Sequence, residues 1–294
     1  MRIGYFADGP WSHRALEKIL ADDAFSVAFI CARFDNPDSI LKEKSSSTGI
    51  PFLVHKNINS DEFLEEIARY DCDIFVSMSF NQIFKDQIIN RCPGGIINCH
   101  AGKLPFYRGR NVLNWALIND EKEFGVTVHY VDPGVDTGDI VRQECYEITD
   151  EDDYSTLLNR SYKYCADVLY SSLTDLLSGQ VKRRSQEDIH PVGFYCSQRK
   201  VGDEILDWNQ SSREIFNFVR AICKPGPQAR TYLAGTEVKI NKLDLVPGAP
   251  AYKGIPGAVL GIEDGCLLVK TADSFVKVVD WSSDAKIRVG GRMQ

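Results

Sequence analysis

The sequence predicts an α/β fold, with a Rossmann-like, mostly parallel sheet in an N-terminal domain and a small β-rich, OB-like module at the C-terminal end. In the first part, short runs that are apolar throughout alternate with helical segments. This alternation is typical of a parallel sheet that helices cover on both faces. In the second part, one helix precedes short alternating strands that are separated by turn residues.

The predicted sheet begins with three strands. Arg2–Phe6 is an apolar run that ends in a turn, Ser26–Cys31 is a second run, and Pro51–His55 is a short third one. Ser12 is expected to cap the helix between the first two strands. Asp35–Gly49 is polar, and we interpret it as a loop with about one helical turn.

The chain then adds two more core strands, further helices and two strands that are expected at a mixed edge of the sheet. A turn rich in carboxylates and glycine, Asp132–Asp139, joins the two edge strands. The predicted elements are a helix from Ser60 or Asp61 to Tyr70, strands Asp73–Ser79 and Gly95–His100, a helix at Asn111–Ile118, strands Val126–Val131 and Ile140–Ile148, and a long amphipathic helix at Asp153–Leu177.

Two domains are expected, with boundaries 1–180 and 190–294. Between them, Lys182–Gln186 is polar, and we interpret it as a linker. The second domain is predicted to contain a helix at Ser211–Ile222. Its hairpin turns are expected at Ala234-Gly235, Glu263-Asp264-Gly265 and Ala272-Asp273-Ser274.

Composition limits the classes of protein to which the chain can belong. The formal net charge of −7 and the pI near 5.3 disfavour a surface built to grip nucleic acid. The nine cysteines are scattered without a CxxC pair, so we expect reduced thiols and no metal site. No signal peptide or long apolar run is visible, so we expect a cytoplasmic protein without a membrane partner. The oligomeric state stays open, a homodimer included.

Polar side chains gather at the end of the predicted fifth strand. Asn98 and His100 are two positions apart, so they project to the same face of an extended strand. Ligands of open parallel sheets bind beyond the carboxyl ends of the strands. The following loop, Ala101–Arg110, is basic, aromatic and rich in Gly and Pro, which suits a binding loop. We expect the Asp132–Asp139 turn to reach the same edge and to bring Asp136 against His100.

The combined pattern of Asn98-x-His100, Leu104-Pro105, Arg108-Gly109 and Asp136-Thr137-Gly138-Asp139 resembles the signature of the folate-dependent formyltransferases. That family includes methionyl-tRNA formyltransferase, glycinamide ribonucleotide formyltransferase and the sugar N-formyltransferases. The resemblance covers about residues 1–180 well. The C-terminal part is more loosely similar to the module of the tRNA and aminosugar branches.

The resemblance implies transfer of a formyl group from 10-formyltetrahydrofolate to an amine, with Asn98, His100 and Asp136 as catalytic residues. Asn98 would donate a hydrogen bond to the oxyanion that forms when the amine attacks the formyl carbon. His100 would take the amine proton or stabilise the oxyanion, and Asp136 would orient His100 and relay protons through a water. This chemistry needs no metal.

The resemblance also implies where the folate lies. The pterin is expected against two backbone segments, whose main-chain groups can bond its flat edge. The residues concerned are Phe80, Asn81, Gln82, Ile83, Phe84, Val131, Asp132 and Gly134.

The acceptor is expected to be a nucleotide-linked aminosugar, such as a dTDP- or UDP-amino-deoxyhexose destined for lipopolysaccharide O-antigen. Asp8–Ser12 lacks the glycine- and serine-rich turn expected of the glycinamide ribonucleotide branch. The tRNA branch should carry a basic insertion at Asp35–Gly49 and a basic C-terminal domain. Here that loop has a roughly even charge balance, and from Pro191 on there are 14 basic and 11 acidic side chains. The candidate acceptor-binding residues are Trp11, Lys103, Tyr107, Arg108 and Arg110.

Three other interpretations stay open. Methionyl-tRNA formylation is the main alternative, hydrolysis of the formyl donor without an acceptor is a second, and a folate- or nucleotide-binding regulatory protein is a third. Gly9 is not part of a GxGxxG turn, which disfavours a dinucleotide dehydrogenase. The remaining histidines lack polar company in the sequence, so we expect surface or packing roles for His13, His55, His129 and His190.

Overall fold

The computed structural model describes residues 1–294, which form two compact units that interleave along the chain. The first unit contains residues 1–110, 124–146 and 159–196. The second unit contains residues 111–123, 147–158 and 197–294. The helix predicted at Asn111–Ile118 and the start of the long helix therefore group with the C-terminal residues.

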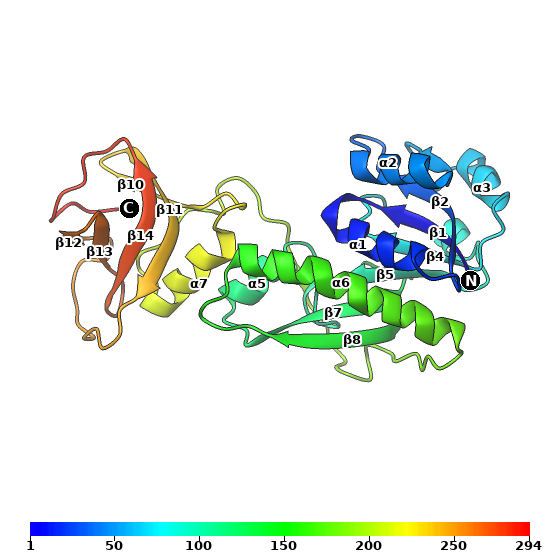
Figure 1. Ribbon diagram of the computed structural model, residues 1–294. Helices are drawn as coiled ribbons and strands as arrows, with labels where there is room; N and C mark the ends of the chain where they lie inside the picture. The colour runs from blue at the N-terminus through cyan, green and yellow to red at the C-terminus, as the bar shows by residue number, and fades with distance from the viewer. The chain divides into compact units, whose positions relative to one another are not determined.

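A seven-stranded sheet forms the centre of the first unit (Figure 1). β1 to β5 run parallel, and β7 runs antiparallel to β5, so the prediction of a mostly parallel sheet with a mixed edge is confirmed. The strand order is β3 (Phe52–Val54), β2 (Ser26–Ala32), β1 (Arg2–Ala7), β4 (Ile74–Met78), β5 (Ile96–His100), β7 (Glu123–Tyr130) and β8 (Ile140–Glu147).

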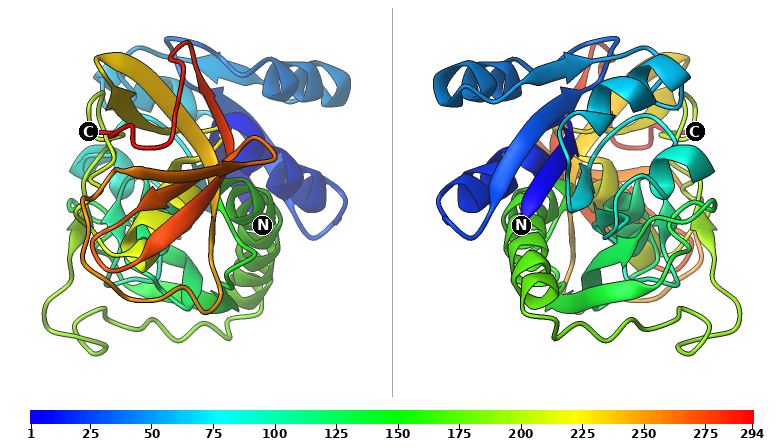
Figure 2. Two further views of the ribbon diagram at one scale, coloured as in Figure 1. Left: turned by 90° about the vertical axis from the view of Figure 1, so that its left-hand side faces the viewer. Right: turned by 90° about the vertical axis from the view of Figure 1, so that its right-hand side faces the viewer.

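Helices cover both faces of this sheet (Figures 1 and 2). α1 (Gly9–Leu20) and α6 (Tyr154–Leu177) pack together on one face, where the Trp11 and Tyr162 rings meet edge-on with centroids 4.8 Å apart. α3 (Asp61–Ala68) and the short α4 (Asp86–Ile89), which was not predicted, cover the other face. They bury a set of rings that we call the phenylalanine cluster, namely Phe6, Phe29, Phe63, Phe75 and Phe84.

The segment after β2 is a helix, so the prediction of a loop at Asp35–Gly49 is wrong. α2 spans Ser39–Thr48, and the Asp38 carboxylate caps it by accepting the N–H of Leu41 at 2.8 Å. Gly49 ends the helix in the left-handed conformation, with φ at 72°. These two caps outweigh the low helix propensity of a segment rich in serine and threonine.

Ser12 does not cap α1, contrary to prediction. The helix begins at Gly9, one turn earlier, with Asp8 in the cap position. The Ser12 side chain is buried and donates its hydroxyl to the carbonyl oxygen of Gly9. Pro10 suits the first turn, because the missing N–H has no partner there in any helix.

The second unit contains a five-stranded antiparallel sheet, which confirms the predicted β-rich C-terminal part. Its strand order is β10 (Ala229–Leu233), β11 (Thr236–Leu245), β14 (Phe275–Ser283), β13 (Cys266–Lys270) and β12 (Val259–Glu263). Bridges from Arg292 to Ala258 and from Met293 to Leu233 tie the final residues to both edges of the sheet. The three predicted hairpin turns lie between paired strands, as expected.

Two helices pack within the second unit. α7 (Ser212–Ile222) begins with a capping box in which Ser211 and Glu214 each bond the backbone N–H of the other. α5 (Val112–Ile118) lies against it, and Asn114 donates its amide to the carbonyl of Ala221 at 2.6 Å.

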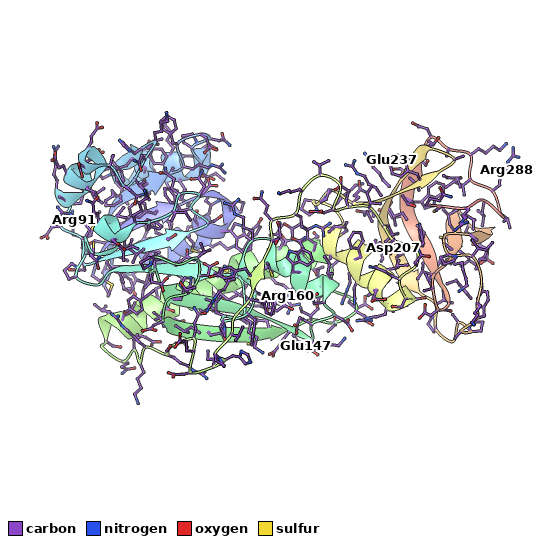
Figure 3. All side chains as sticks on the ribbon, turned by 180° about the vertical axis from the view of Figure 1, so that it is seen from behind. Arg91, Glu147, Arg160, Asp207, Glu237 and Arg288 are labelled. Atoms are coloured by element: carbon purple, nitrogen blue, oxygen red, sulfur yellow. The ribbon has the colours of Figure 1, made fainter.

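The surface carries charged side chains of both signs. Arg91, Asp207 and Arg288 are exposed and project away from the ribbon (Figure 3). No helix combines the length and the apolar character that crossing a membrane requires. All nine cysteines are free thiols, and seven of them are buried.

Candidate active site

β5 delivers two polar side chains beyond the end of the apolar core. Every second side chain of β5 lies on the same face of the sheet, namely Ile96, Asn98 and His100, and Ile96 packs with the phenylalanine cluster. Cys99 points to the opposite face, where its thiol donates to the carbonyl of Cys165. His100 is 9% exposed and Asn98 is half-buried, so both lie at the boundary between core and solvent.

The loop after β5 fixes the His100 ring. Nε2 donates to the carbonyl oxygen of Tyr107 at 2.7 Å. Because a carbonyl oxygen can only accept, this bond assigns the proton of the neutral ring to Nε2 and leaves Nδ1 as the basic atom. The loop passes so close that a Cβ on Gly102 would overlap Nε2 and lie 2.5 Å from the Tyr107 oxygen. The turn is completed by Tyr107, whose φ is 54°.

Asp136 faces His100, as predicted. Its Oδ2 lies 3.7 Å from Nδ1 of His100 and accepts the backbone N–H of Gly109 at 2.8 Å. Its Oδ1 lies 3.4 Å from Nε2 of His129. The backbone at Asp136 is left-handed, with φ at 54°, which aspartate tolerates better than most residues.

The surroundings of Asp136 keep it ionised. Burial by itself raises the pKa of this carboxyl. The charge that His100 carries when protonated, the hydrogen bond and charge that His129 supplies when protonated, and the N–H of Gly109 more than offset burial and hold the pKa well below its usual range. The carboxylate can therefore stabilise a proton on either imidazole.

His129 is buried beside Asn98 and Asp136, so the structure adds it to the candidate site, which the expected surface or packing role did not include. β7 pairs with β5 in a register that sets His129 opposite Asn98. Its Nδ1–H donates to the carbonyl of Tyr130 at 2.8 Å, and its Nε2 lies 3.2 Å from the Asn98 amide nitrogen. Its side chain is 2% exposed, so it is committed to these neighbours.

The arrangement combines three chemical functions within reach of one another. Asn98 supplies an amide donor for a developing oxyanion, and the Nδ1 of His100 supplies a base. Asp136 supplies the negative charge that stabilises a protonated imidazole. These three side chains fit a reaction in which a neutral nucleophile attacks a carbonyl carbon and loses a proton as it does so.

The two segments predicted to hold the folate converge on the phenylalanine cluster. The rings of Phe80 and Phe84 lie with their centroids 5.5 and 5.2 Å from that of Phe6, and Val131 packs against the same cluster. Gln82 ties its loop down by donating to the carbonyl of His55 at 2.8 Å.

The outer parts of these two segments differ in exposure and in bonding. Ile83 is 63% exposed, and the exposed Asn81 donates to the carboxylate of Asp35. In the other segment, the Asp132 carboxylate accepts from Gly134 N–H and from the Thr137 hydroxyl, which shapes the turn that carries Asp136.

The predicted acceptor-binding residues have different environments. Arg108 donates both Nε and Nη2 to Oε1 of Gln186, at 3.1 and 2.7 Å. Tyr107 is buried and its ring packs edge-on against Phe194. Lys103 is half-buried and Arg110 is exposed. The Trp11 ring is half-buried and rests on α6.

The segment 182–186 is not simply a solvated linker. Arg184 exchanges two backbone hydrogen bonds with Ile140, at 2.8 and 3.0 Å. This pairing sets Gln186 beside the Asp136 turn, where it is only 3% exposed. Its amide nitrogen donates to the carbonyl oxygens of Asp136 and Gly138, at 2.9 and 2.8 Å.

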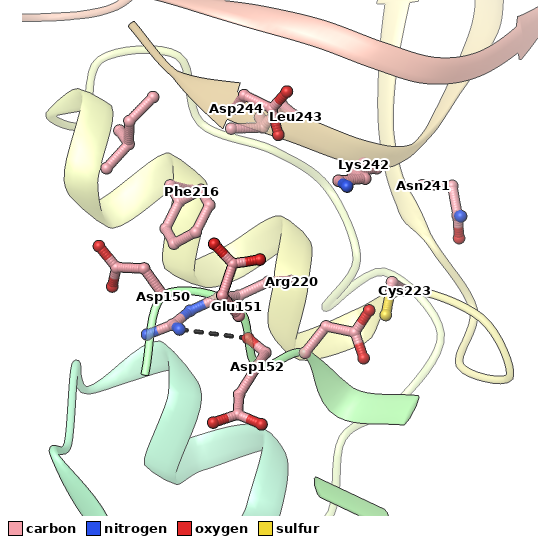
Figure 4. Close-up of a pocket in the computed structure, with 12 residues that line it drawn as sticks. Asp150, Glu151, Asp152, Phe216, Arg220, Cys223, Asn241, Lys242, Leu243 and Asp244 are labelled. Atoms are coloured by element: carbon pink, nitrogen blue, oxygen red, sulfur yellow. Dashed lines mark hydrogen bonds between the residues drawn. The ribbon is translucent and has the colours of Figure 1, made fainter. Parts of the chain in front are cut away.

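A cavity of about 290 Å³ lies within the second unit (Figure 4). Its walls include Asp150, Asp152 and Arg220, and none of the residues named above as catalytic candidates lines it. Asp150 is paired with Arg213, and Arg220 donates to the carbonyls of Thr149 and Asp152. No group of three or more His, Cys, Asp or Glu side chains is arranged to hold a metal ion.

Two regions of the chain match known domains. Residues 2–173 match the formyl transferase domain, and residues 199–292 match the formyl transferase C-terminal domain. Among curated relatives, the methionyl-tRNA formyltransferase of Halothermothrix orenii is 34% identical over 293 residues, which cover 95% of this chain and 92% of that protein. That of Streptococcus agalactiae is 32% identical over 276 residues, covering 91% and 86%.

Among similar solved structures, two are N-formyltransferases crystallised with dTDP or a dTDP-linked aminosugar. WlaRD, a sugar 3N-formyl transferase crystallised in the presence of dTDP and 5-N-formyl-THF, has a TM-score of 0.73 at 21% identity and covers 98% of this chain and 99% of its own. The N-formyltransferase from Helicobacter canadensis, in complex with folinic acid and dTDP-3-aminofucose, has a TM-score of 0.68 at 20% identity, covering 96% and 99%.

Proposed function

The chain belongs to the formyl transferase family, and from this premise we propose that it transfers the formyl group of 10-formyltetrahydrofolate to the amine of a nucleotide-linked aminosugar. The acceptor would be a dTDP- or UDP-amino-deoxyhexose. The observation that carries the formyl-transfer chemistry is the convergence of Asn98, His100 and Asp136 at the end of β5.

These residues account for each proton and charge in the reaction. The amine nitrogen attacks the formyl carbon, and Asn98 donates the amide hydrogen that is not directed at His129 to the oxyanion. Such a donor typically contributes about 3 kcal/mol to transition-state stabilisation. The Nδ1 of His100 takes the amine proton, and Asp136 stabilises the imidazolium. The proton then passes to N10 of tetrahydrofolate as the carbon–nitrogen bond to the donor breaks.

The folate is proposed to lie between the Phe80–Phe84 and Val131–Gly134 segments. Both border the phenylalanine cluster, so an apolar wall adjoins the exposed residues Asn81, Ile83 and Gly134. The structures of WlaRD and of the H. canadensis enzyme were determined with formylated folates, which supports the same co-substrate here. No step in this chemistry requires a metal.

Charge at the carboxyl ends of β1 and β2 favours a small acceptor over tRNA. Arg33 is held between two carboxylates, with Nη1 3.2 Å from Asp8 and Nη2 2.6 Å from Asp35. His13 lies 3.0 Å from Asp38. The Arg33 guanidinium is thus already paired with two carboxylates, whereas binding of a tRNA backbone depends on cations that phosphate can reach.

Methionyl-tRNA formylation is the second candidate, and a specific observation favours it. The relatives that reach 32–34% identity over most of the chain are methionyl-tRNA formyltransferases. The full-length likeness to two sugar N-formyltransferases supports the first candidate at lower identity.

Residues 1–180 are proposed as the catalytic domain and 190–294 as the β-rich module, in a cytoplasmic protein.

A direct assay separates the two candidates. Consumption of 10-formyltetrahydrofolate is measured against a panel of dTDP- and UDP-linked aminosugars and against methionyl-tRNA, with Asp136→Asn as the low-activity reference. The proposal expects rapid turnover with at least one aminosugar nucleotide. Turnover with methionyl-tRNA alone would assign the chain to the second candidate.

A further inference from the structure

We propose that Gln186 is a positioning residue for formyl transfer, which holds the catalytic carboxylate of Asp136 in place through the backbone of its turn. The inference rests on the proposed roles of His100 and Asp136. It concerns a side chain that lies outside the resemblance pattern and touches neither the imidazole nor the carboxylate.

Gln186 bonds the Asp136 turn on both sides of Thr137. Its Nε2 donates to the carbonyl oxygen of Asp136 at 2.9 Å and to that of Gly138 at 2.8 Å. Both hydrogens of the amide are therefore used. Because the side chain is 3% exposed, water has little access to replace either bond.

The oxygen of the Gln186 amide is bonded by the Arg108–Gly109 segment, which also contacts the Asp136 carboxylate. Oε1 of Gln186 accepts from Nε and Nη2 of Arg108. The next residue, Gly109, donates its N–H to Oδ2 of Asp136. The Arg108–Gly109 segment thus reaches the Asp136 turn twice, through Gln186 to the backbone and directly to the carboxylate.

Together these hydrogen bonds fix the position of the Asp136 backbone and the direction in which its side chain points. Asp136 has a left-handed φ of 54°, and its Oδ2 stands 3.7 Å from Nδ1 of His100. A displacement of about 1 Å at this distance changes both the ionic attraction and the alignment of the ring, and errors of that size are costly in active sites. Glutamine is suited to the task because it presents two donors and an acceptor at once.

Two substitutions separate the parts of this role. Gln186→Met keeps the length of the side chain and removes both hydrogen-bond donors and the acceptor. Gln186→Glu keeps the acceptor for Arg108 but, when ionised, has no hydrogen to donate to the Asp136 and Gly138 carbonyls. Thr231→Val is the matched control, since it removes buried bonds to Trp208 and Gln294 in the second unit.

The kinetic test is a double-mutant cycle with Asp136→Asn. Gln186→Met is expected to lower kcat about 10- to 100-fold in the native background and less than about threefold in the Asp136→Asn background, because two residues that act as a unit are not additive. Gln186→Glu should resemble Gln186→Met, and Thr231→Val should lower Tm without changing kcat. An equal loss of kcat in both backgrounds would overturn the proposal.

A structural test needs no acceptor. Crystals of Gln186→Met are grown with 5-formyltetrahydrofolate, and the Asp136 carboxylate is expected to move away from Gly109 and His100. A carboxylate that keeps its native position would overturn the proposal, whatever the acceptor proves to be. If instead the carboxylate moves and no aminosugar nucleotide is formylated, the positioning role stands and the proposed acceptor fails.

Discussion

The Nδ1 of His100 and the Oδ2 of Asp136 lie 3.7 Å apart, although 36 positions (136 − 100) separate the residues in the chain. This distance exceeds a hydrogen bond but allows strong attraction once the imidazole gains a proton. In the proposed reaction, this carboxylate would stabilise the imidazolium that forms when His100 takes the proton of the amine.

Asp136→Asn should therefore lower kcat by about 10²- to 10⁴-fold, the range expected when a charged partner of a general base is lost. Steady-state kinetics with 10-formyltetrahydrofolate and the accepted amine measure this loss. Asp139→Asn is the matched control in the same turn and should keep at least about half of the activity. Comparable losses in the two variants would mean that Asp136 acts only in shaping the turn.

Stability at acid pH should depend on the same carboxylate. The pKa of Asp136 is lower in the folded protein than its unfolded value of about 4. The stabilisation is therefore present above about pH 4 and is lost as the pH falls toward the folded-state pKa. Urea titrations between pH 3 and 7 should show the native chain losing stability relative to Asp136→Asn below about pH 4. A difference that does not change with pH would contradict the depressed pKa.

His129 should contribute to catalysis through its two neighbours. Its Nε2 faces the Asn98 amide at 3.2 Å and the Asp136 carboxylate at 3.4 Å, so His129→Ala frees both side chains. We expect kcat to fall about 10- to 100-fold, as for other lost orienting groups. His55→Gln is the control, because the His55 side chain contacts Asn57, Glu62 and the Phe63 ring and none of Asn98, His100 and Asp136. Native kcat in His129→Ala would contradict this role.

Gly102 should tolerate no side chain. A Cβ there would overlap the His100 ring and crowd the Tyr107 carbonyl, so Gly102→Ala must displace the histidine. We expect at least about a 100-fold loss of kcat, because a shift of about 1 Å at a reacting group is enough for such a loss. Gly261→Ala, where the neighbouring atoms belong to the flexible Leu268 side chain, should be close to native. Thermal unfolding monitored alongside kcat separates loss of the site from loss of the fold.

The sequence was most informative where a side chain's place depends on local periodicity. The two-residue period of β5 predicts that Asn98 and His100 share a face, and the uniform apolar runs predict a parallel sheet. The acidic turn before Ile140 predicts that Asp136 reaches the same edge. All three follow from patterns within a few residues.

The features that were missed depend on pairing between distant segments. His129 enters the site because β7 pairs antiparallel to β5 in one register, and a shift of one residue would turn it to the other face. Gln186 is buried because Arg184 bridges to Ile140. A polar run such as 182–186 gives no local signal for which of its members is buried, so the interpretation as a linker was the natural one.

The two arginines of the loop after β5 should have separable effects. Arg108 bonds Gln186, which holds the Asp136 turn, so Arg108→Ala should lower kcat about 10-fold or more. Arg110 is exposed, and its guanidinium is a candidate for the acceptor's diphosphate. Arg110→Ala should raise the acceptor KM about 10-fold and leave kcat within about twofold, the signature of lost uniform binding.

The same kinetics with Arg91→Ala provide the control, since Arg91 is an exposed arginine that follows α4. If neither Arg108→Ala nor Arg110→Ala raises the acceptor KM, these arginines do not bind the acceptor. The diphosphate would then have to be held by other cations. If Arg108→Ala alone raises KM with kcat unchanged, Arg108 contacts substrate directly, and its bond to Gln186 is replaced when the acceptor binds.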